Sequence, residues 1–485
     1  MARGSGLRYY VAMSADSPPS LPVHDIIEPL IQTLAEADEA VLQAPPGAGK
    51  TTVVPLELLN APWLGGRKIL VLEPRRVAAR NAANRMAALL GERVGETVGY
   101  RIRLDACVSA KTRIEVITEG ILTRRLQRDP SLDDIGLVIF DEFHERNLDS
   151  DLCLALCLAG RRLFREEVPL KLLVMSATLD EDAVSALMGG APVLSSDGRQ
   201  YPVTTHYLGP HRLRDPIEPP VVKAIARALL EEQGSVLVFL PGQREIRNVA
   251  RELDALLQGT GASDVDVLPL YGSLPLARQQ QAIEPAPTGR RKVVLATNLA
   301  ETSLTIDGVT VVVDSGLARE ALFDPATATT RLTTRRISRA SAEQRTGRAG
   351  RTAPGICYRL WNEQQQDRLV QKSTPEILQS DLAPLALQLL SWGAMDPAEL
   401  AWLDPPPRAA WDQALGVLER CGAAYRNESG ACQLTPHGVR LAQMPLHPRL
   451  AHMLLLGCDI HATATACLAA SILSERNPFG DETHH

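Results

Sequence analysis

The sequence predicts an α/β protein with two parallel-sheet domains in tandem, followed by a smaller, mainly helical region. Three observations indicate this fold class: short apolar runs alternate with helix-patterned stretches, the alternation restarts once in mid-chain, and it fades after about residue 375. Helices cover a parallel sheet on both faces, so its strands read as continuous apolar runs. The length of 485 residues also exceeds what one hydrophobic core usually serves.

The first series of strands is expected at residues 40–42, 69–73, 113–117, 136–140 and 171–175. Between these runs, residues 76–90 and 148–163 have helical spacing. We therefore expect one α/β domain over residues 21–200, preceded by a polar leader, residues 1–20, that is disordered.

The second series of strands is expected at residues 235–240, 265–268, 292–296 and 309–314. It predicts a second α/β domain over residues 201–372. Beyond it, helical spacing dominates at residues 382–390, 409–421 and 450–473.

Composition restricts the partners and the compartment. The net charge of −6 argues weakly against nucleic acid, but seven arginines lie between residues 331 and 351 with Glu343 as the single acid among them. A basic run is usually only a solvated face, so it decides nothing alone. The eight cysteines show no zinc spacing, and Cys153 and Cys157, one helical turn apart, are expected to be core thiols. We expect a reducing cytoplasm and no membrane span.

A glycine-rich loop, Ala-Pro-Pro-Gly-Ala-Gly-Lys-Thr at residues 44–51, follows a strand and precedes a helix. Backbone N–H groups of such a loop suit a polyphosphate, Lys50 would reach the β- and γ-phosphates, and Thr51 would hold Mg²⁺. Ala44 stands where glycine is usual, which loosens the match, and a chance turn is the alternative. The expected phosphate contacts are Pro46, Gly47, Ala48, Gly49, Lys50, Thr51 and Thr52.

Two carboxylates, Asp141 and Glu142, follow the strand at residues 136–140. Ligands in parallel-sheet enzymes lie beyond the carboxyl ends of the strands, beside the phosphate loop. One carboxylate there can hold Mg²⁺ with Thr51 while its neighbour orients the attacking water, and both remain candidate metal ligands. A helix cap is the alternative reading of these acids.

Seven segments in their order along the chain resemble the motifs of the superfamily 2 DEAH-box helicases. They are residues 47–51, 74–76, 118–120, 141–144, 176–178, 297–306 and 344–351. The resemblance covers about residues 22–475. Its longest parts are residues 72–79, 296–306 and 341–351. Phe143, where alanine is usual, resembles the bacterial HrpB branch.

The resemblance implies two RecA-like domains, a winged-helix domain at residues 373–442 and the start of a truncated helical ratchet domain at residues 443–485. It also implies an ATP-dependent RNA helicase that uses Mg²⁺, moves 3′-to-5′ on single-stranded RNA and acts as a monomer. DNA remains open as a partner, as does an unknown protein activator. A remodelling switch gated by a partner protein, with little unwinding, is the alternative function.

Several side chains receive roles from the resemblance. Arg348 and Arg351 would reach the nucleotide from the second domain as exposed cleft residues, with Gln344 placing water. His144 would act as a relay between the domains. Ser176 and Thr178 would couple the phosphate site to the nucleic acid.

Nucleic acid is expected to be held through its phosphodiester backbone, independently of sequence. The residues implied are Arg75, Thr118, Gly242, Gln243, Arg244 and Thr302. Residues 317–338 would form a β-hairpin with Asp324 in its turn.

No residue is expected to distinguish one nucleotide base from another. Residues 24–42 lack the glutamine motif of DEAD-box relatives, and Arg85 and Ile283 occupy the positions that would sandwich the base. Asp307 is a further expected nucleotide contact. Neither Arg85 nor Ile283 reads a base edge, so other nucleoside triphosphates besides ATP should be accepted.

Overall fold

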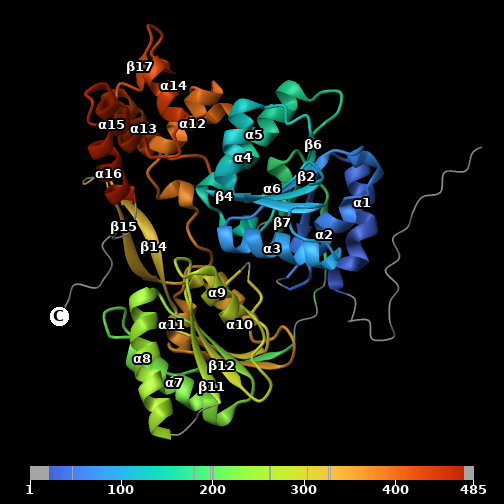
Figure 1. Cartoon of the computed structure of the whole chain (residues 1–485), viewed down its shortest axis with the longest axis vertical. Helices are drawn as coiled ribbons and strands as arrows, with labels where there is room; N and C mark the ends of the chain where they lie inside the picture. Colours follow the sequence, from blue (N-terminus) through green and yellow to red (C-terminus); the bar gives the residue numbers. More distant parts are fainter. Residues whose placement is uncertain are drawn as a thin grey trace, which may run out of the picture.

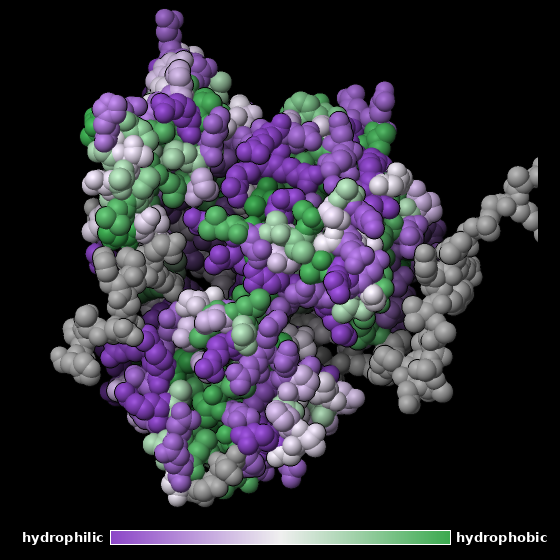
Figure 2. All heavy atoms as spheres, in the orientation of Figure 1, coloured by the Kyte–Doolittle hydropathy of each residue, from purple (hydrophilic) through white to green (hydrophobic). Residues whose placement is uncertain are grey.

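The computed structural model describes residues 21–45, 47–177, 181–196, 198, 201–260, 264–302, 304–325, 327 and 329–474. Two sheets in tandem and a helical C-terminal region account for this part of the chain (Figure 1). Hydrophilic side chains cover most of the face seen in Figure 2. No helix in the described ranges is long and apolar enough to cross a membrane.

The first sheet has the strand order β4-β3-β5-β2-β6-β7-β1-β8. Its strands are β1 (Glu39–Gln43), β2 (Lys68–Leu72), β3 (Val98–Ile102), β4 (Asp105–Cys107), β5 (Ile114–Ile117), β6 (Ile135–Phe140), β7 (Lys171–Ser176) and β8 (Val193–Ser195). All neighbours pair in parallel except the edge strand β4, which pairs antiparallel with β3. The central strands β6 and β7 are buried along their whole length, which explains their apolar sequence.

Helices cover both faces of this sheet, and alternate strand residues point to opposite faces. Ala40 and Leu42 of β1 pack with α1 (Ile27–Glu36), α2 (Lys50–Leu58) and α3 (Arg76–Leu89). Val41, between them, packs with α4 (Glu119–Arg128) and α5 (Leu148–Phe164). The short helices η3 (Phe143–Glu145) and α6 (Glu181–Leu187) follow β6 and β7.

The second sheet is parallel, with the order β11-β12-β10-β13-β16-β9. Its strands are β9 (Val203–Tyr207), β10 (Ser235–Phe239), β11 (Val265–Leu270), β12 (Arg291–Ala296), β13 (Val309–Asp314) and β16 (Gly355–Arg359). The helices are α7 (Glu218–Glu231), α8 (Gln243–Thr260), α9 (Leu276–Ile283), α10 (Arg339–Gly347) and α11 (Glu363–Asp367). The two sheets confirm the predicted pair of tandem RecA-like domains.

A long antiparallel hairpin, β14 (Leu317–Asp324) and β15 (Thr329–Arg336), leaves the second domain and reaches the C-terminal helices (Figure 1). The backbone N–H of Phe323 donates to the carbonyl of Gln379 at 3.3 Å. In the turn, Asp324 accepts a hydrogen bond from the hydroxyl of Thr327 at 2.9 Å. The hairpin predicted for residues 317–338 is therefore confirmed.

The C-terminal region packs directly on the first domain. It contains α12 (Ala383–Trp392), α13 (Arg408–Arg420), the hairpin β17 (Ala424–Arg426) and β18 (Cys432–Leu434), α14 (Pro436–Ala442), α15 (Pro448–Asp459) and α16 (Thr463–Ser474). Leu385 and Trp411 of this region lie in one buried cluster with Leu152 and Leu156 of α5. The region and the first domain therefore share a hydrophobic core.

Some predictions of secondary structure were incomplete or wrong. Strands β3, β4, β8, β9 and β16 were not predicted. The stretch 450–473 is two helices, because His461 has a left-handed φ of 60° between α15 and α16. A Cβ at Gly457 would lie 2.4 Å from Cβ of Ala466, so glycine permits the close packing of this pair. Cys153 and Cys157 are buried free thiols, as predicted.

Candidate nucleotide site between the two domains

A cavity of about 680 Å³ lies between the two RecA-like domains. The predicted site residues that line it are Gly47, Gly49, Lys50, Thr51, Thr52, Arg85, Glu142, Thr302, Asp307 and Arg351. Ile283 of α9 also lines the cavity, as does Arg85 of α3. Residues from both domains thus enclose one space next to the glycine-rich loop.

The glycine-rich loop has a left-handed backbone conformation at two of its glycines. Gly47 and Gly49 have φ values of 87° and 97°, and Gly49 is the N-cap of α2. Ala44 is buried and lies outside the left-handed region, so alanine in place of the usual glycine causes no strain. Lys50 is 4% exposed and its Nζ donates to the carbonyl of Ala44. Ala48 is buried in the loop, and Pro46 lies outside the described residues.

The two acids follow β6 directly and are both buried. The hydroxyl of Thr51 donates to Oδ2 of Asp141, and Oδ1 of Asp141 accepts from the backbone N–H of Glu142 at 2.8 Å. Glu142 has a left-handed φ of 49°, a costly conformation for a residue with a side chain. This turn directs Glu142 into the cavity, while Asp141 stays behind it against Thr51.

Burial and neighbouring charges shift the pKa values of the two acids in opposite directions. Burial, and then the charge of Glu142, raise the pKa of Asp141 to about 6, against the opposing effects of Lys50 and Thr51. Burial alone would also raise the pKa of Glu142. The neighbouring His144 and Lys50, with the arginines of the second domain, lower the pKa of Glu142 below its usual value. Glu142 is therefore the acid that this site keeps ionised.

Oxygen atoms of Thr51 and Asp141 already touch beside the phosphate loop. A hydroxyl and a carboxylate are the hard oxygen ligands that Mg²⁺ accepts in nucleotide sites. The residues present therefore fit a magnesium ion. No cluster of three or more histidine, cysteine or acidic ligands occurs in the described ranges.

The two predicted finger arginines differ in environment. Arg351 is half-buried, lies against Gly47 and donates from Nη1 to the hydroxyl of Thr305 at 2.8 Å. Burial lowers the pKa of Arg351 to about 10, partly opposed by Glu142. Its Nε is buried without a protein partner among the described residues. This guanidinium retains capacity for a further acceptor in the cavity.

Arg348 was expected in an exposed cleft, and that expectation was wrong. It is 4% exposed, and its guanidinium donates to three backbone carbonyls. These carbonyls belong to Glu301, Thr302 and Leu304. Glu301, Thr302 and Leu304 lie outside the helices and strands, and buried carbonyl groups need a hydrogen-bond donor. Burial and Arg351 lower the pKa of Arg348.

His144 and Gln344 line a second cavity of about 600 Å³, which Thr302 shares with the first. It lies among both domains and residues 373–379 of the C-terminal region. Nε2 of His144 is 3.5 Å from Oε2 of Glu142, and Nδ1 accepts from the N–H of Ala177 at 3.4 Å. His144 therefore lies between Glu142 and the end of β7. Ser176 is buried there, and Thr178 lies outside the described residues.

The predicted nucleic-acid residues are brought together only in part. Arg75 and Thr302, from different domains, both bond to Glu145. Thr118 is the N-cap of α4. At the start of α8, Gln243 donates to Ser273 at 2.8 Å and Arg244 is exposed.

A side chain at Gly242, just before α8, would displace the guanidinium of Arg319. A Cβ there would lie 2.5 Å from Nη1 of Arg319, which is paired with Glu245 at 3.0 Å. The glycine therefore allows the hairpin strand β14 to approach the start of α8.

Sequence reasoning missed several lining residues. Asn81 and Asn84 line the nucleotide cavity beside Arg85, and Gln280 lines it one turn before Ile283. Their spacing of three and four residues along a helix places them on one face, and that pattern was available in the sequence.

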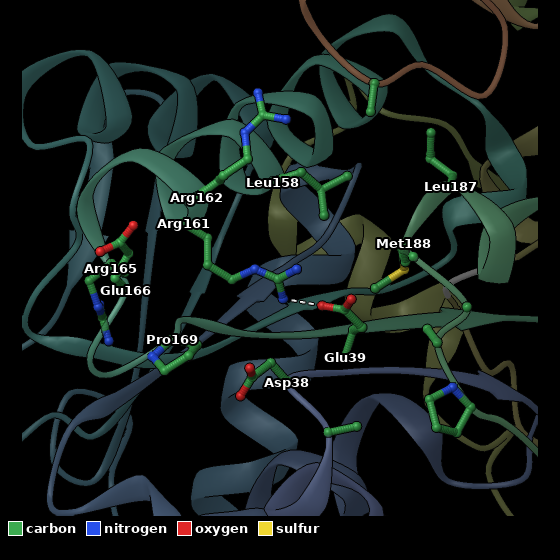
Figure 3. A pocket seen from close by; sticks show the side chains of 16 residues that line it. Asp38, Glu39, Leu158, Arg161, Arg162, Arg165, Glu166, Pro169, Leu187 and Met188 are labelled. Atoms are coloured by element: carbon green, nitrogen blue, oxygen red, sulfur yellow. Dashed lines mark hydrogen bonds and ion pairs between the residues drawn. The ribbon is translucent and has the colours of Figure 1, made fainter.

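A third cavity, of about 630 Å³, lies elsewhere and contains none of the predicted site residues (Figure 3). Its lining includes Glu39 at the amino end of β1, paired with Arg161. Ligand sites of parallel sheets lie at the opposite, carboxyl ends. This cavity is therefore not the nucleotide site.

Two family models match the chain. The DEAD/DEAH box helicase model matches residues 25–187, and the helicase conserved C-terminal domain model matches residues 221–353. The first match contains strands β1 to β7 of the first sheet, and the second contains strands β10 to β13 of the second sheet. The glycine-rich loop and the two acids lie in the first match.

Individual proteins are similar over most of the chain. "ATP-dependent RNA helicase HrpB" of Escherichia coli (strain K12) is 48% identical over 462 residues, covering 95% of this chain and 56% of that protein. "Probable ATP-dependent RNA helicase DHX34" of Mus musculus is 37% identical over 470 residues, covering 95% of this chain and 40% of that protein. The chain thus spans about half the length of these relatives.

The crystal structure of the Escherichia coli DEAH/RHA helicase HrpB superposes with a TM-score of 0.88 at 48% identity, covering 95% of this chain and 57% of that one. Its agreement extends the similarity from the sequence to the arrangement of both domains. The glycine-rich loop, the paired acids, both family models and this structural match agree. They show that the chain belongs to the DEAD/DEAH box helicases, as a DEAH-box member similar to HrpB.

Proposed function

We propose that this chain is an NTP hydrolase that couples ATP hydrolysis to movement along single-stranded RNA, as an ATP-dependent RNA helicase. One observation carries the proposal: a single cavity is lined by Lys50 and Glu142 of the first domain and Arg351 of the second. Lys50 and Glu142, which would bind the phosphates and orient the attacking water, belong to one domain, and Arg351, which would stabilise the transition state, belongs to the other. ATP hydrolysis therefore depends on the two domains approaching each other.

Each group has a role that its position supports. Lys50, at the start of α2, would hold the β- and γ-phosphates. Thr51 and Asp141 would hold Mg²⁺, which when bound neutralises phosphate charge. Glu142, kept ionised, would orient the attacking water. Arg351 would stabilise the charge that develops on the transferred phosphoryl group.

The names of the relatives support RNA as the nucleic acid that this chain binds. The E. coli protein is named an ATP-dependent RNA helicase and the mouse protein a probable one. We propose RNA as the partner on this basis and leave DNA as an arm of the test. We also propose that GTP, CTP and UTP are accepted, because Arg85 and Ile283 both line the cavity and neither reads a base edge.

Further parts of the proposal concern organisation. We propose domain limits of 21–200, 201–372, 373–442 and 443–485, with a winged-helix domain third and the start of a ratchet domain fourth. The hairpin β17–β18 between α13 and α14 supports the third assignment. A monomer in the cytoplasm is proposed, supported by buried thiols that need no oxidising compartment.

Strand separation on tailed duplexes tests the proposal. An RNA duplex with a 3′ single-stranded tail should be separated in the presence of ATP and Mg²⁺, whereas a matched duplex with a 5′ tail should not. Equal separation of both duplexes would refute the proposed 3′-to-5′ movement. A chain that hydrolyses ATP equally fast with and without naked RNA would instead be a switch gated by a partner protein.

A further inference from the structure

Glu145 joins the two domains through a carboxylate that both of them bind. Its Oε2 accepts from Nη2 of Arg75 at 3.1 Å and from Nε at 3.4 Å. Its Oε1 accepts from the hydroxyl of Thr302 in the second domain. Nη1 of Arg75 donates across the same junction to the carbonyl of Asn298 at 2.8 Å.

The donors around Glu145 are the ones proposed to grip the RNA backbone. A phosphodiester and a carboxylate both offer two anionic oxygens, and a guanidinium binds either with the same pair of N–H groups. The side chains of Arg75 and Glu145 are only 21% and 15% exposed, so the contact is largely withdrawn from water. A phosphate cannot reach the same N–H groups and hydroxyl while Glu145 holds them.

We infer that Glu145 stands in for an RNA phosphate in the nucleic-acid-free chain, and that RNA binds by displacing it from Arg75 and Thr302. The inference rests on the proposed function, since it takes RNA as the ligand. Glu145 is thus a positioning residue whose release reports the arrival of RNA.

Release of Glu145 from Arg75 and Thr302 can affect Glu142, because the two residues lie three positions apart in the same short segment. Glu145 ends η3, which begins directly after Glu142, and its N–H donates to the carbonyl of Glu142 at 2.9 Å. On the other side, Arg146 is fixed by ion pairs to Asp151 at 2.9 Å and Asp404 at 2.8 Å. With that end held, a shift of Glu145 is transmitted through η3 toward Glu142. RNA binding and the water-orienting carboxylate are coupled in this way.

Glu145→Gln tests the inference, because the amide keeps the size of the side chain and removes its charge. Fluorescence anisotropy with a labelled single-stranded oligouridylate should give a Kd about tenfold lower than wild type, the ratio that about 1.4 kcal/mol produces. The ATPase rate without RNA should rise, so that the stimulation by RNA becomes smaller. A purely structural role for Glu145 would leave the RNA affinity unchanged or weaken it.

Glu320→Gln is the matched control. Glu320 lines the same cavity as Glu145, so this variant removes one charge from the same space. Arg75 donates to Glu145 and Asn298, and within the described ranges no hydrogen bond or ion pair joins it to Glu320. An equal gain in affinity from Glu320→Gln would overturn the inference in favour of general repulsion. Should Glu145→Gln fail to fold, Glu145→Asp is measured: its shorter side chain keeps the charge but loses one of the two donors, so Kd should fall by less. An unchanged or weaker affinity of Glu145→Asp would overturn the inference.

Failure of the inference and failure of the proposed function are distinguishable in this design. A wild-type chain that binds no RNA refutes the proposed function. A wild-type chain that binds RNA no more weakly than Glu145→Gln refutes only the competition by Glu145.

Discussion

Nε2 of His144 lies 3.5 Å from Oε2 of Glu142, while its Nδ1 accepts a hydrogen bond from the backbone of Ala177. The ring therefore connects the end of β7 with the carboxylate that faces the nucleotide cavity. It also contributes to lowering the pKa of Glu142 against the effect of burial. An ionised carboxylate with a fixed neighbour is suited to orient water.

Glu142→Gln should keep nucleotide binding and slow hydrolysis by about 10²–10⁴, the usual contribution of a positioned base. Lys50→Ala should act differently and weaken nucleotide binding, because Lys50 is the phosphate-holding cation that lines the cavity. Equilibrium binding of a fluorescent ATP analogue, combined with steady-state kinetics, separates the two effects. Near wild-type turnover in Glu142→Gln would mean that Glu142 does not orient the water.

Arg351→Ala should reduce kcat by roughly 10³ or more, as loss of an arginine finger does, with little change in Tm. Its guanidinium donates to the hydroxyl of Thr305 rather than to buried backbone carbonyls. Arg348→Ala should lower Tm as well, because it leaves three buried carbonyls without their donor.

Each buried carbonyl left without a donor costs about 1–3 kcal/mol, and each kcal/mol lowers the Tm of a domain of this size by about 2–4 °C. Differential scanning fluorimetry of both variants checks the contrast. An unchanged Tm in Arg348→Ala would contradict the structural role assigned to that residue.

The four common nucleoside triphosphates should be hydrolysed with kcat/KM values within roughly tenfold of one another, a spread of about 1.4 kcal/mol. Arg85 can stack on any base and Ile283 offers only apolar contact. Parallel kinetics with ATP, GTP, CTP and UTP measure the spread. A preference for ATP above roughly a hundredfold would require a base-reading group, for which Asn84 and Gln280 in the cavity lining are the first candidates.

Glu119 predicts a pH dependence of stability. Burial is the main cause that raises its pKa from 4.5 to about 7, while Ser150 and Asn147 act in the opposite direction. Between these two values the folded state holds a proton that the unfolded state releases, so the free energy of unfolding falls as the pH rises. Glu119→Gln should therefore be more stable than wild type at pH 8, by on the order of 3 kcal/mol, and no more stable at pH 4.5.

Measuring Tm for Glu119→Gln and wild type at both pH values checks this, because the difference cancels the other titrating groups. The oxygen of the amide can still accept from Ser150 and Asn147. A difference in Tm that is the same at both pH values would contradict the assignment.

All the predicted strands were confirmed, and most of them are buried on both faces and therefore leave apolar runs in the sequence, although β11 is only half-buried. The edge strands β4 and β8 were not predicted because each has only three residues, too few to leave an apolar run. The motif at residues 344–351 indicates arginines but not which of them is buried, since burial depends on the distant loop at 301–304. Likewise, nothing local marks Glu145 as the partner of Thr302, a residue 157 positions away.

The central claim is that RNA itself drives the nucleotide cycle, and the rate of ATP hydrolysis tests it most directly. The rate is measured with single-stranded RNA, with single-stranded DNA of the same sequence and with neither, at one fixed salt concentration because backbone binding depends on salt. Glu142→Gln serves as the blank for contaminating hydrolases. We predict that RNA raises the rate above the nucleic-acid-free value, whereas a rate that is identical in all three conditions would contradict the account.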